Sequence, residues 1–217
     1  GGRLAVRGGG GWKGKVIEIP GDISSAALLI ALGLIAPDSR VTIKGVGLNP
    51  TRTRFLDMLR AMGGKIEVVV SGMMGLEPVG DVTAETSPLT GLALPPEEVP
   101  ALTDEIPVLA VAASFAEGTT EIRGASELRV KESDRIRSLS LNLSRFGVQV
   151  EELEDGLRIR GGAGFKGCRV NSFGDHRIAL AMLCMGALAK GETRVDSAGC
   201  VKVSYPGFFE TINHLAL

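Results

Sequence analysis

The chain has 217 residues, with 24 Lys or Arg against 25 Asp or Glu, so its formal net charge at pH 7 is −1. A protein that binds nucleic acid through general charge attraction is usually strongly basic, and this balance argues against that class. Hydrophobic residues make up 44% and charged residues 23% of the chain, which is typical of a folded protein and not of a disordered one. Because only 4% of residues are aromatic, we expect Ala, Leu, Val and Ile to build the core.

The longest nearly apolar runs are Ala26–Ala36 and Ile178–Ala189, which are shorter than the roughly 18 residues that a membrane-spanning helix needs. We expect two buried helices and no membrane partner. The cysteines show no CxxC spacing and the histidines are few, so no metal site is expected. With no recognisable signal peptide, this pattern predicts a reducing, cytoplasmic setting. Because the chain begins with Gly rather than Met, we expect a fragment or a processed product.

A pattern that occurs three times organises the chain. Each copy has an acidic residue, an apolar run, a turn with Gly or Pro, and an alternating run. The copies begin at Asp22, Asp104 and Asp175, and their alternating runs contain Ile43, Ile122 and Val195. An acidic residue at a helix start caps free N–H groups, while alternation is typical of a half-buried strand. The sequence therefore predicts three helix–turn–strand units, and a chance likeness between unrelated units stays open as the alternative.

A second amphipathic helix is predicted in each unit, over Thr53–Met62, Arg135–Phe146 and Gly207–Leu215. Strand-like runs follow the first two, over Lys65–Val70 and Val148–Glu151. We read each unit as βαβαββ or a close variant, which predicts an α+β fold with helices under mixed sheets. Residues 71–100 fit this pattern poorly because they are rich in Gly and Pro, and we expect them to contain a crossing between two lobes.

Polar groups occur at the same place in all three units, where a helix begins. The groups are Ser24 and Ser25 in the first, Asp104 in the second, and Asp175, His176 and Arg177 in the third. Arg52 precedes the second helix of the first unit, and the charged run Lys131-Glu-Ser-Asp-Arg135 follows a strand or loop at residues 128–130. If the helices point their N-termini into one cleft, these groups converge, and an anionic substrate is the natural inference.

Each group also has a structural explanation that the sequence leaves open. Asp104 is explained by helix capping alone, and Arg52 by a solvated surface position. A lone histidine such as His176 is more often structural than functional. The run from Lys131 to Arg135 is equally typical of a solvated, capped helix start.

The sequence resembles the 5-enolpyruvylshikimate-3-phosphate (EPSP) synthase family over almost all of its length. The matching motifs are Pro20-Gly-Asp-Ile-Ser-Ser-Ala-Ala27, Asn49-Pro-Thr-Arg-Thr53, Asp104-Glu-Ile-Pro-Val-Leu-Ala-Val-Ala-Ala113, Leu128-Arg-Val-Lys-Glu-Ser-Asp-Arg135, Asp175-His-Arg-Ile-Ala179 and Ser204-Tyr-Pro-Gly-Phe208. The run from Leu128 to Arg135 is highly specific. The resemblance implies the enolpyruvyl transferase fold, a two-lobed inside-out α/β barrel built from βαβαββ repeats, of which this chain would form an incomplete version with neither lobe whole.

The resemblance implies a reaction between phosphoenolpyruvate and shikimate 3-phosphate that gives an enolpyruvyl ether and phosphate. It implies no metal and no organic cofactor. An acid protonates the methylene carbon of phosphoenolpyruvate, the acceptor hydroxyl attacks, and phosphate leaves a tetrahedral intermediate. Both substrates are anions, and the proton transfers need positioned acids and bases, which suits the residues found here.

Residue roles follow from the same motifs. Asp104 is expected to accept the proton of the attacking hydroxyl, and Glu132 and Lys131 are expected to transfer protons. The expected substrate-binding residues are Ser24, Ser25, Arg52, Lys131, Arg135, Asp175, His176, Arg177 and Lys202. Among these, Arg135 and Arg177 would clamp phosphoenolpyruvate, and the serine pair would hold the shikimate phosphate.

The sequence departs from the family at several positions. Leu28 stands where many relatives have an aromatic residue, so one substrate wall differs. Val203 stands where some relatives have a substrate lysine, and Lys202 is the nearest replacement. The chain matches the C-terminal half of the family, without the Lys-Ser anion site and the loops that govern sensitivity to glyphosate. We therefore expect residues 1–70 to be the last part of the N-terminal lobe, residues 71–217 most of the C-terminal lobe, and a complementary N-terminal half as partner.

Two other functions stay open at this point. One is a non-catalytic anion-binding or assembly fragment that keeps the anion sites without chemistry. The other is a relative of UDP-N-acetylglucosamine enolpyruvyl transferase, which shares the fold and phosphoenolpyruvate.

Overall fold

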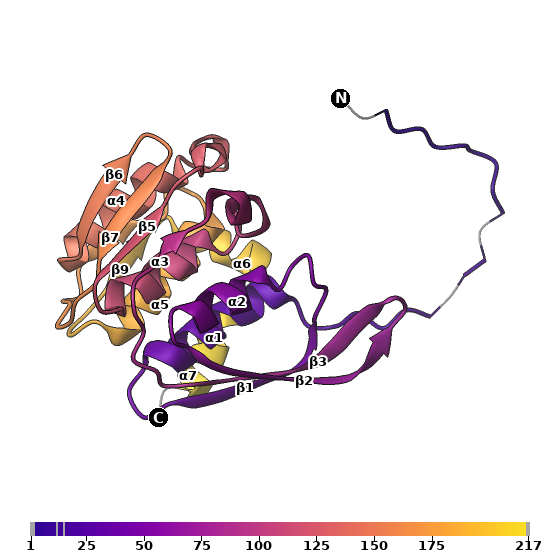
Figure 1. Cartoon of the computed structure of the whole chain (residues 1–217), viewed down its shortest axis with the longest axis horizontal. Coiled ribbons are helices and arrows are strands. Elements are labelled where there is room, and N and C mark those ends of the chain that lie inside the picture. Colours follow the sequence, from indigo (N-terminus) through magenta and orange to yellow (C-terminus); the bar gives the residue numbers. More distant parts are fainter. Residues whose placement is uncertain (1–2, 12, 15, 216–217) are drawn as a thin grey trace.

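Three apolar helices lie side by side and form the centre of the fold. The computed structural model describes residues 3–11, 13–14 and 16–215, and in it α1 (Ile23–Ile35), α3 (Ile106–Phe115) and α5 (His176–Leu188) all contact one another (Figure 1). Their sequences are rich in Ala, Leu and Ile on every side, so each helix is buried by its neighbours and by the sheets around it. The two apolar runs predicted as buried helices are thus confirmed as α1 and α5.

In the first unit, α1 packs against a three-stranded sheet. It consists of β1 (Arg40–Gly47), α2 (Arg54–Ala61), β2 (Lys65–Met74) and β3 (Glu77–Glu85). The strand order is β1-β3-β2, with antiparallel neighbours. On the far side of β1, Gly21 pairs with Val46 through an isolated parallel bridge.

The second unit repeats this topology around α3. It consists of β4 (Ala93–Leu94), β5 (Thr119–Ile122), α4 (Arg135–Phe146), β6 (Gln149–Leu153) and β7 (Gly156–Arg160). The order is β4-β5-β7-β6, with the first pair parallel and the others antiparallel. Gly21 occupies the place of β4 in the first unit, so the predicted repeat is a structural repeat and not a chance likeness.

The third unit shows the beginning of the same pattern. Strands β8 (Arg169–Asn171) and β9 (Arg194–Asp196) pair in parallel on either side of α5 in the chain, and α6 (Val201–Ser204) and α7 (Phe208–Leu215) follow. Within residues 3–215 as described, no antiparallel strand joins β9 in the way that β3 joins β1. Three short 3₁₀ helices are also present, η1 (Pro96–Ala101), η2 (Ser126–Val130) and η3 (Ala198–Cys200).

Residues 71–100 differ from the prediction. They do not simply cross between lobes, because β2 continues to Met74 and β3 forms the central strand of the first sheet. The alternation of β3 is visible in its buried residues Gly80, Val82 and Ala84. Glycine is required at position 80 because a Cβ there would lie 2.2 Å from the Val69 carbonyl oxygen. The segment at residues 128–130, expected as strand or loop, belongs to η2.

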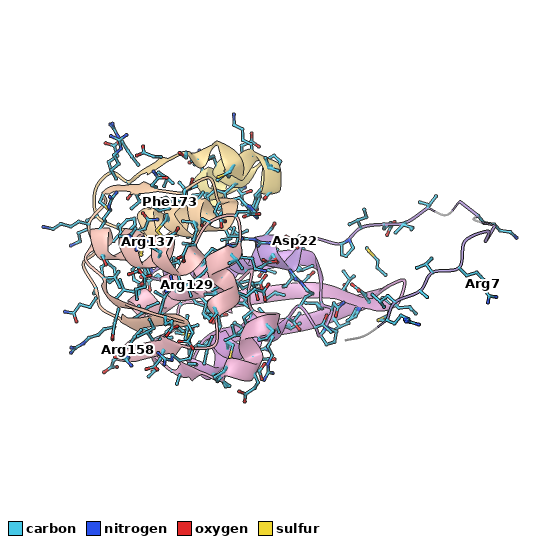
Figure 2. All side chains as sticks on the ribbon, turned by 90° about the horizontal axis from the view of Figure 1, so that it is seen from above. Arg7, Asp22, Arg129, Arg137, Arg158 and Phe173 are labelled. Carbon is cyan, nitrogen blue, oxygen red and sulfur yellow. The ribbon has the colours of Figure 1, made fainter. Side chains whose placement is uncertain are left out.

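The structure shows no division at residue 70. That position lies inside β2, and residues of all three units share one hydrophobic core that extends from Ile23 to Phe208. The described residues before Pro20 contain no regular element, and they project from the helices beside the β2–β3 hairpin (Figures 1 and 2). Residues 1–2 and 216–217, the outer ends of the two expected lobes, lie outside the described residues. Among the helices that are described, none has both the length and the apolarity to cross a bilayer.

Candidate active site

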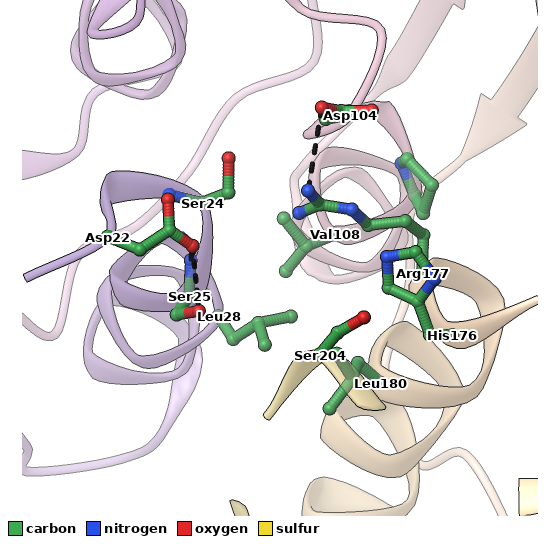
Figure 3. A pocket seen from close by; sticks show the side chains of 11 residues that line it. Asp22, Ser24, Ser25, Leu28, Asp104, Val108, His176, Arg177, Leu180 and Ser204 are labelled. Atoms are coloured by element: carbon green, nitrogen blue, oxygen red, sulfur yellow. Dashed lines mark hydrogen bonds and ion pairs between the residues drawn. The ribbon is translucent and has the colours of Figure 1, made fainter. Parts of the chain in front are cut away.

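The N-termini of α1, α3 and α5 converge on one pocket (Figure 3). The first turns of the three helices supply nearly all of its lining, and Ser204 at the end of α6 completes it. The lining residues are Asp22, Ser24, Ser25, Leu28, Asp104, Pro107, Val108, His176, Arg177, Leu180 and Ser204. Free N–H groups and the positive ends of helix dipoles at such a place favour bound anions. From the sequence, the polar groups are expected to converge only if the helix N-termini point into one cleft. The structure shows that the three N-termini do meet in this way.

Acidic side chains cap two of these helices but not the third. Asp22 accepts hydrogen bonds from the N–H groups of Ser24 and Ser25, and Asp175 accepts from that of Arg177 at 2.8 Å. The cap position of α3 is Glu105, whose side chain makes no capping bond. Capping alone therefore does not explain Asp104, and the side chain of this residue is left for other contacts.

Asp104 lies among three arginine side chains from three different segments. Its Oδ2 is 3.4 Å from Arg177 Nη2 (Figure 3). The same Oδ2 is 3.6 Å from Arg52 Nη2, and Oδ1 is 3.6 Å from Arg135 Nη1. The carboxylate is about one-third exposed, so it faces the pocket rather than the core. A carboxylate held this way among cations can take up a proton from a bound hydroxyl group.

Arg135 and Asp175 form a buried ion pair beneath the pocket. Arg135 Nε donates to Asp175 Oδ2 at 2.8 Å, and the two side chains are 3% and 0% exposed. Burial alone would raise the pKa of Asp175, but the hydrogen bond and charge of Arg135 outweigh it, and the pKa lies below its ordinary value. Burial likewise acts to lower the pKa of Arg135, and the contact with Asp175 raises it above its ordinary value.

Glu132 and His176 join the same cluster. Glu132 Oε2 lies 3.2 Å from His176 Nδ1 and accepts a hydrogen bond from Arg135 Nη2 at 3.1 Å. The potential ligand atoms of Glu132, Asp175 and His176 all lie within 4.8 Å of one another, a spacing at which three such groups can hold a metal ion. The positive charge at this place, however, is the guanidinium of Arg135, which contacts both carboxylates. Arg135 therefore balances the charge of the two carboxylates, and Glu132 and His176 are groups that can transfer protons.

A hydrogen-bonded chain links α1 to α3 at the edge of the pocket. Arg52 Nη2 donates to Ser24 Oγ at 2.8 Å, and Ser24 Oγ donates to Glu105 Oε1 at 2.5 Å. Glu105 is 3% exposed, and burial raises its pKa above the ordinary value in spite of the Ser24 hydrogen bond. Sequence reasoning did not single out Glu105 or Ser204 as site residues. The available signals were the position of Glu105 beside Asp104 and that of Ser204 at the start of a family motif.

Three predicted site residues, Lys131, Lys202 and Ser25, have surroundings that differ from the expectation. The ammonium of Lys131 pairs with Glu127 one turn earlier and does not line the pocket. Lys202 is exposed on α6, where Ser204 faces the pocket instead. Ser25 lines the pocket, but its hydroxyl donates to Asp22 at 2.8 Å.

The described cluster has more carboxylates than arginines. The carboxylates are Asp22, Asp104, Glu105, Glu132 and Asp175, and the arginines are Arg52, Arg135 and Arg177. The helix dipoles and the arginine N–H groups favour binding of an anion here. The described residues of the cluster, however, do not create a large positive potential.

Comparison with known proteins gives a consistent result. The family EPSP synthase (3-phosphoshikimate 1-carboxyvinyltransferase) matches residues 1–212. The 3-phosphoshikimate 1-carboxyvinyltransferase of Desulforamulus reducens is 49% identical over 203 residues, which are 94% of this chain and 47% of the relative. That of a Geobacter species (strain M21) is 47% identical over 98% of this chain and 49% of the relative.

Solved structures agree with this result. An EPSP synthase from Acinetobacter baumannii has a TM-score of 0.88 and 37% identity over 92% of this chain and 46% of that chain. The enolpyruvyl transferase NikO from Streptomyces tendae, at 20% identity and a TM-score of 0.67 over 89% of this chain and 42% of that chain, shares the fold. The fold is thus the expected enolpyruvyl transferase fold, and the chain spans about half the length of the curated relatives it matches. The chain belongs to the EPSP synthase family.

Proposed function

We propose that this chain supplies one part of a 3-phosphoshikimate 1-carboxyvinyltransferase and acts together with a complementary N-terminal half. The reaction is transfer of the enolpyruvyl group of phosphoenolpyruvate to shikimate 3-phosphate, with release of phosphate. The observation that carries the proposal is the placement of Asp104 among Arg52, Arg135 and Arg177 at the meeting point of three helix N-termini. The names of the relatives that match most of this chain support the same reaction.

Arg135 and Arg177 are proposed to bind phosphoenolpyruvate. Each has a buried nitrogen that lacks a hydrogen-bond partner among the described residues, Nη1 of Arg135 and Nε of Arg177. An unsatisfied buried donor is unfavourable unless a ligand completes it, and a guanidinium group suits the geometry of carboxylate and phosphate oxygens. Asp175 holds Arg135 in this orientation through its buried ion pair.

Asp104 is proposed to accept the proton of the acceptor hydroxyl as its oxygen attacks phosphoenolpyruvate. Glu132, beside His176, is proposed to deliver the proton to the methylene carbon, with Lys131 assisting when it is released from Glu127. Phosphate then leaves the tetrahedral intermediate, and loss of the carbon-bound proton restores the double bond. Ser24, Ser25 and Arg52 are proposed to contact shikimate 3-phosphate at the opposite side of the pocket, and Lys202 is retained as an outer contact.

Three observations support a complementary half as partner. The carboxylates of the cluster outnumber its arginines, so further cations are needed to attract two phosphorylated substrates. The edge of β9 has no antiparallel neighbour among the described residues, in contrast to β1 and β5. The relatives contain about as much sequence outside the matched region as inside it. Because residues 21–215 share one core, we place the boundary between lobes near residue 20 rather than at residue 70.

Phosphate release by the chain co-expressed with the complementary half of a close relative tests this proposal. Shikimate 3-phosphate should support turnover, and UDP-N-acetylglucosamine should not. Turnover with the second acceptor alone would assign the chain to the other transferase class. Binding of phosphoenolpyruvate without turnover by a folded assembly would instead make it an anion-binding module. We place the activity in a reducing cytoplasm, which is supported by the free thiols of Cys168, Cys184 and Cys200.

A further inference from the structure

Glu105 is a buried carboxylate beside the pocket for which the proposed reaction has no direct use. Its side chain is 3% exposed, although it directly precedes a helix whose N-terminus opens on the pocket. It does not cap that helix. It accepts instead the hydroxyl hydrogen of Ser24, which comes from α1. The carboxylate therefore acts across the junction of two units and not within its own helix.

The contact with Glu105 determines what Ser24 can do. A serine hydroxyl has one hydrogen to donate and two lone pairs that accept. Because the hydrogen is directed to Glu105, the oxygen is left as an acceptor, and Arg52 Nη2 donates to it at 2.8 Å. Ser24 is 2% exposed, so bulk water does not compete for this arrangement. The buried Glu105 carboxylate thus determines the direction in which the Ser24 hydroxyl points.

The same arginine nitrogen lies beside the proposed base. Arg52 Nη2 is 3.6 Å from Asp104 Oδ2 and 3.8 Å from Glu105 Oε1. The Arg52 side chain is 46% exposed, and a long side chain of this kind samples many rotamers unless a hydrogen bond restrains it. Of the three guanidinium groups around Asp104, this is the most exposed one.

We propose that Glu105 is a positioning residue, which turns the Ser24 hydroxyl so that its oxygen holds Arg52 beside Asp104. The inference rests on the proposed function only for the importance of Asp104, since the hydrogen-bonded chain itself is a property of the unliganded protein. Loss of the Glu105 acceptor lets the Ser24 hydroxyl rotate, releases Arg52, and removes one of the cations next to the base.

NMR spectra of the arginine guanidinium groups test the proposal on this chain without substrate. A restrained guanidinium rotates slowly and gives separate Nη–H signals, whereas a free one gives averaged signals. The Arg52 signals are assigned by their loss in Arg52→Lys. We expect them to be separate in the wild type and in Glu105→Gln, whose amide oxygen still accepts from Ser24, and averaged in Glu105→Leu and in Ser24→Ala.

Two controls keep the result interpretable. The Arg135 signals, which depend on Asp175, report that each variant is folded. Glu98→Leu removes both carboxylate acceptors of another arginine, Arg54, and should change the Arg54 signals only. Unchanged Arg52 signals in Glu105→Leu would overturn the proposal. Averaged signals in Glu105→Gln would overturn the hydrogen-bond route and leave a direct charge contact between Glu105 and Arg52.

Kinetics of the assembly with the complementary half provide a second readout. Glu105→Leu should lower kcat/KM on the order of 100-fold through misplacement of Arg52, and Glu105→Gln should retain most of it. Adding Glu105→Leu to Ser24→Ala should change the rate little beyond Ser24→Ala alone, because Glu105 acts through the Ser24 hydroxyl. An inactive wild-type assembly would contradict the proposed function, while the NMR result would still decide the role of Glu105.

Discussion

Asp104 Oδ2 and Arg177 Nη2 lie 3.4 Å apart, although the two residues stand at the N-termini of different helices and belong to different repeats. The contact exists because α3 and α5 pack side by side with their N-termini at the same end. Repetition of one structural unit therefore brings together a carboxylate and a guanidinium group that are far apart in the sequence. The predictions below follow from this arrangement.

Asp104→Asn should lower kcat of the assembled enzyme on the order of 10² to 10⁴-fold, because the amide cannot accept the hydroxyl proton. Substrate binding should change less than kcat, since the arginines remain. Phosphate release under saturating substrate measures the effect. Glu67→Gln on the exposed face of β2 is the matched control and should leave the rate unchanged. A similar loss in both variants would show that Asp104 has no special part in the reaction.

Asp175→Ala should lower the free energy of unfolding by about 3–5 kcal/mol, because it leaves the Arg135 guanidinium buried without its partner. Asp22→Ala removes an equivalent helix cap without leaving a buried charge unpaired, and it should lower the free energy of unfolding by about 1 kcal/mol. Urea unfolding of the two variants gives the comparison. Equal losses would mean that capping, and not the ion pair, is what Asp175 contributes to stability.

Glu105 should make the stability of the protein depend on pH. Burial raises its pKa in the folded chain, so the stability linked to its protonated form is fully present below the ordinary pKa of about 4.3 and is lost as pH rises through the folded value. Glu105→Gln does not titrate at this position. The unfolding free energy of the wild type should therefore fall relative to that of Glu105→Gln as the pH rises above the ordinary glutamate pKa of about 4.3. A constant difference over this rise in pH would contradict the direction of the shift.

Asp175 should show the opposite dependence. Although burial opposes it, the contact with Arg135 holds the pKa of this carboxyl below its ordinary value, so its contribution to stability is present above that value and is lost on acidification. The wild type should lose stability relative to Asp175→Asn as pH falls below about 3.9. Unfolding curves measured at several acidic pH values provide the check, and a gain of relative stability there would contradict it.

The chain without its partner should self-associate through the edge of the first sheet. β2 is an edge strand, and its Val70 and Met73 are 60% and 62% exposed. Exposed apolar edge strands pair with other chains, and a lysine on the edge opposes such pairing. Val70→Lys should therefore shift light scattering towards the monomer, whereas Val6→Lys, in a segment without regular structure, should not. Equal effects of the two changes would argue against self-association through the edge of the first sheet.

Much of the fold was predictable because its local signals agree with its tertiary structure. The helix starts at Asp22 and Asp175 follow from capping, and the strand after each apolar helix follows from alternation. The strand β3 was missed because Gly and Pro residues in and around it are also typical of loops. We propose a lobe boundary near residue 20 in place of residue 70 because α1, α3 and α5 bury one another in a single core, for which the sequence contains no local signal.

The candidate site was predictable as a set of residues but not as a set of contacts. Family motifs indicated Asp104, Arg135 and Arg177, and the structure brings these side chains together. The contact between Ser24 and Glu105 joins two repeats through side-chain packing, for which the sequence contains no local signal. The pairing of Lys131 with Glu127 is a one-turn contact that competes with the role expected from the motif.

The rate of phosphate release from phosphoenolpyruvate and shikimate 3-phosphate, measured as the complementary half is titrated into this chain, tests the central claim most directly. The account predicts negligible release by the chain alone, and a rate that rises with the added half and becomes constant at equal amounts of the two. Substantial release by the chain alone, at a rate that the complementary half does not change, would contradict the account. The cluster around Asp104 would then be sufficient for the reaction.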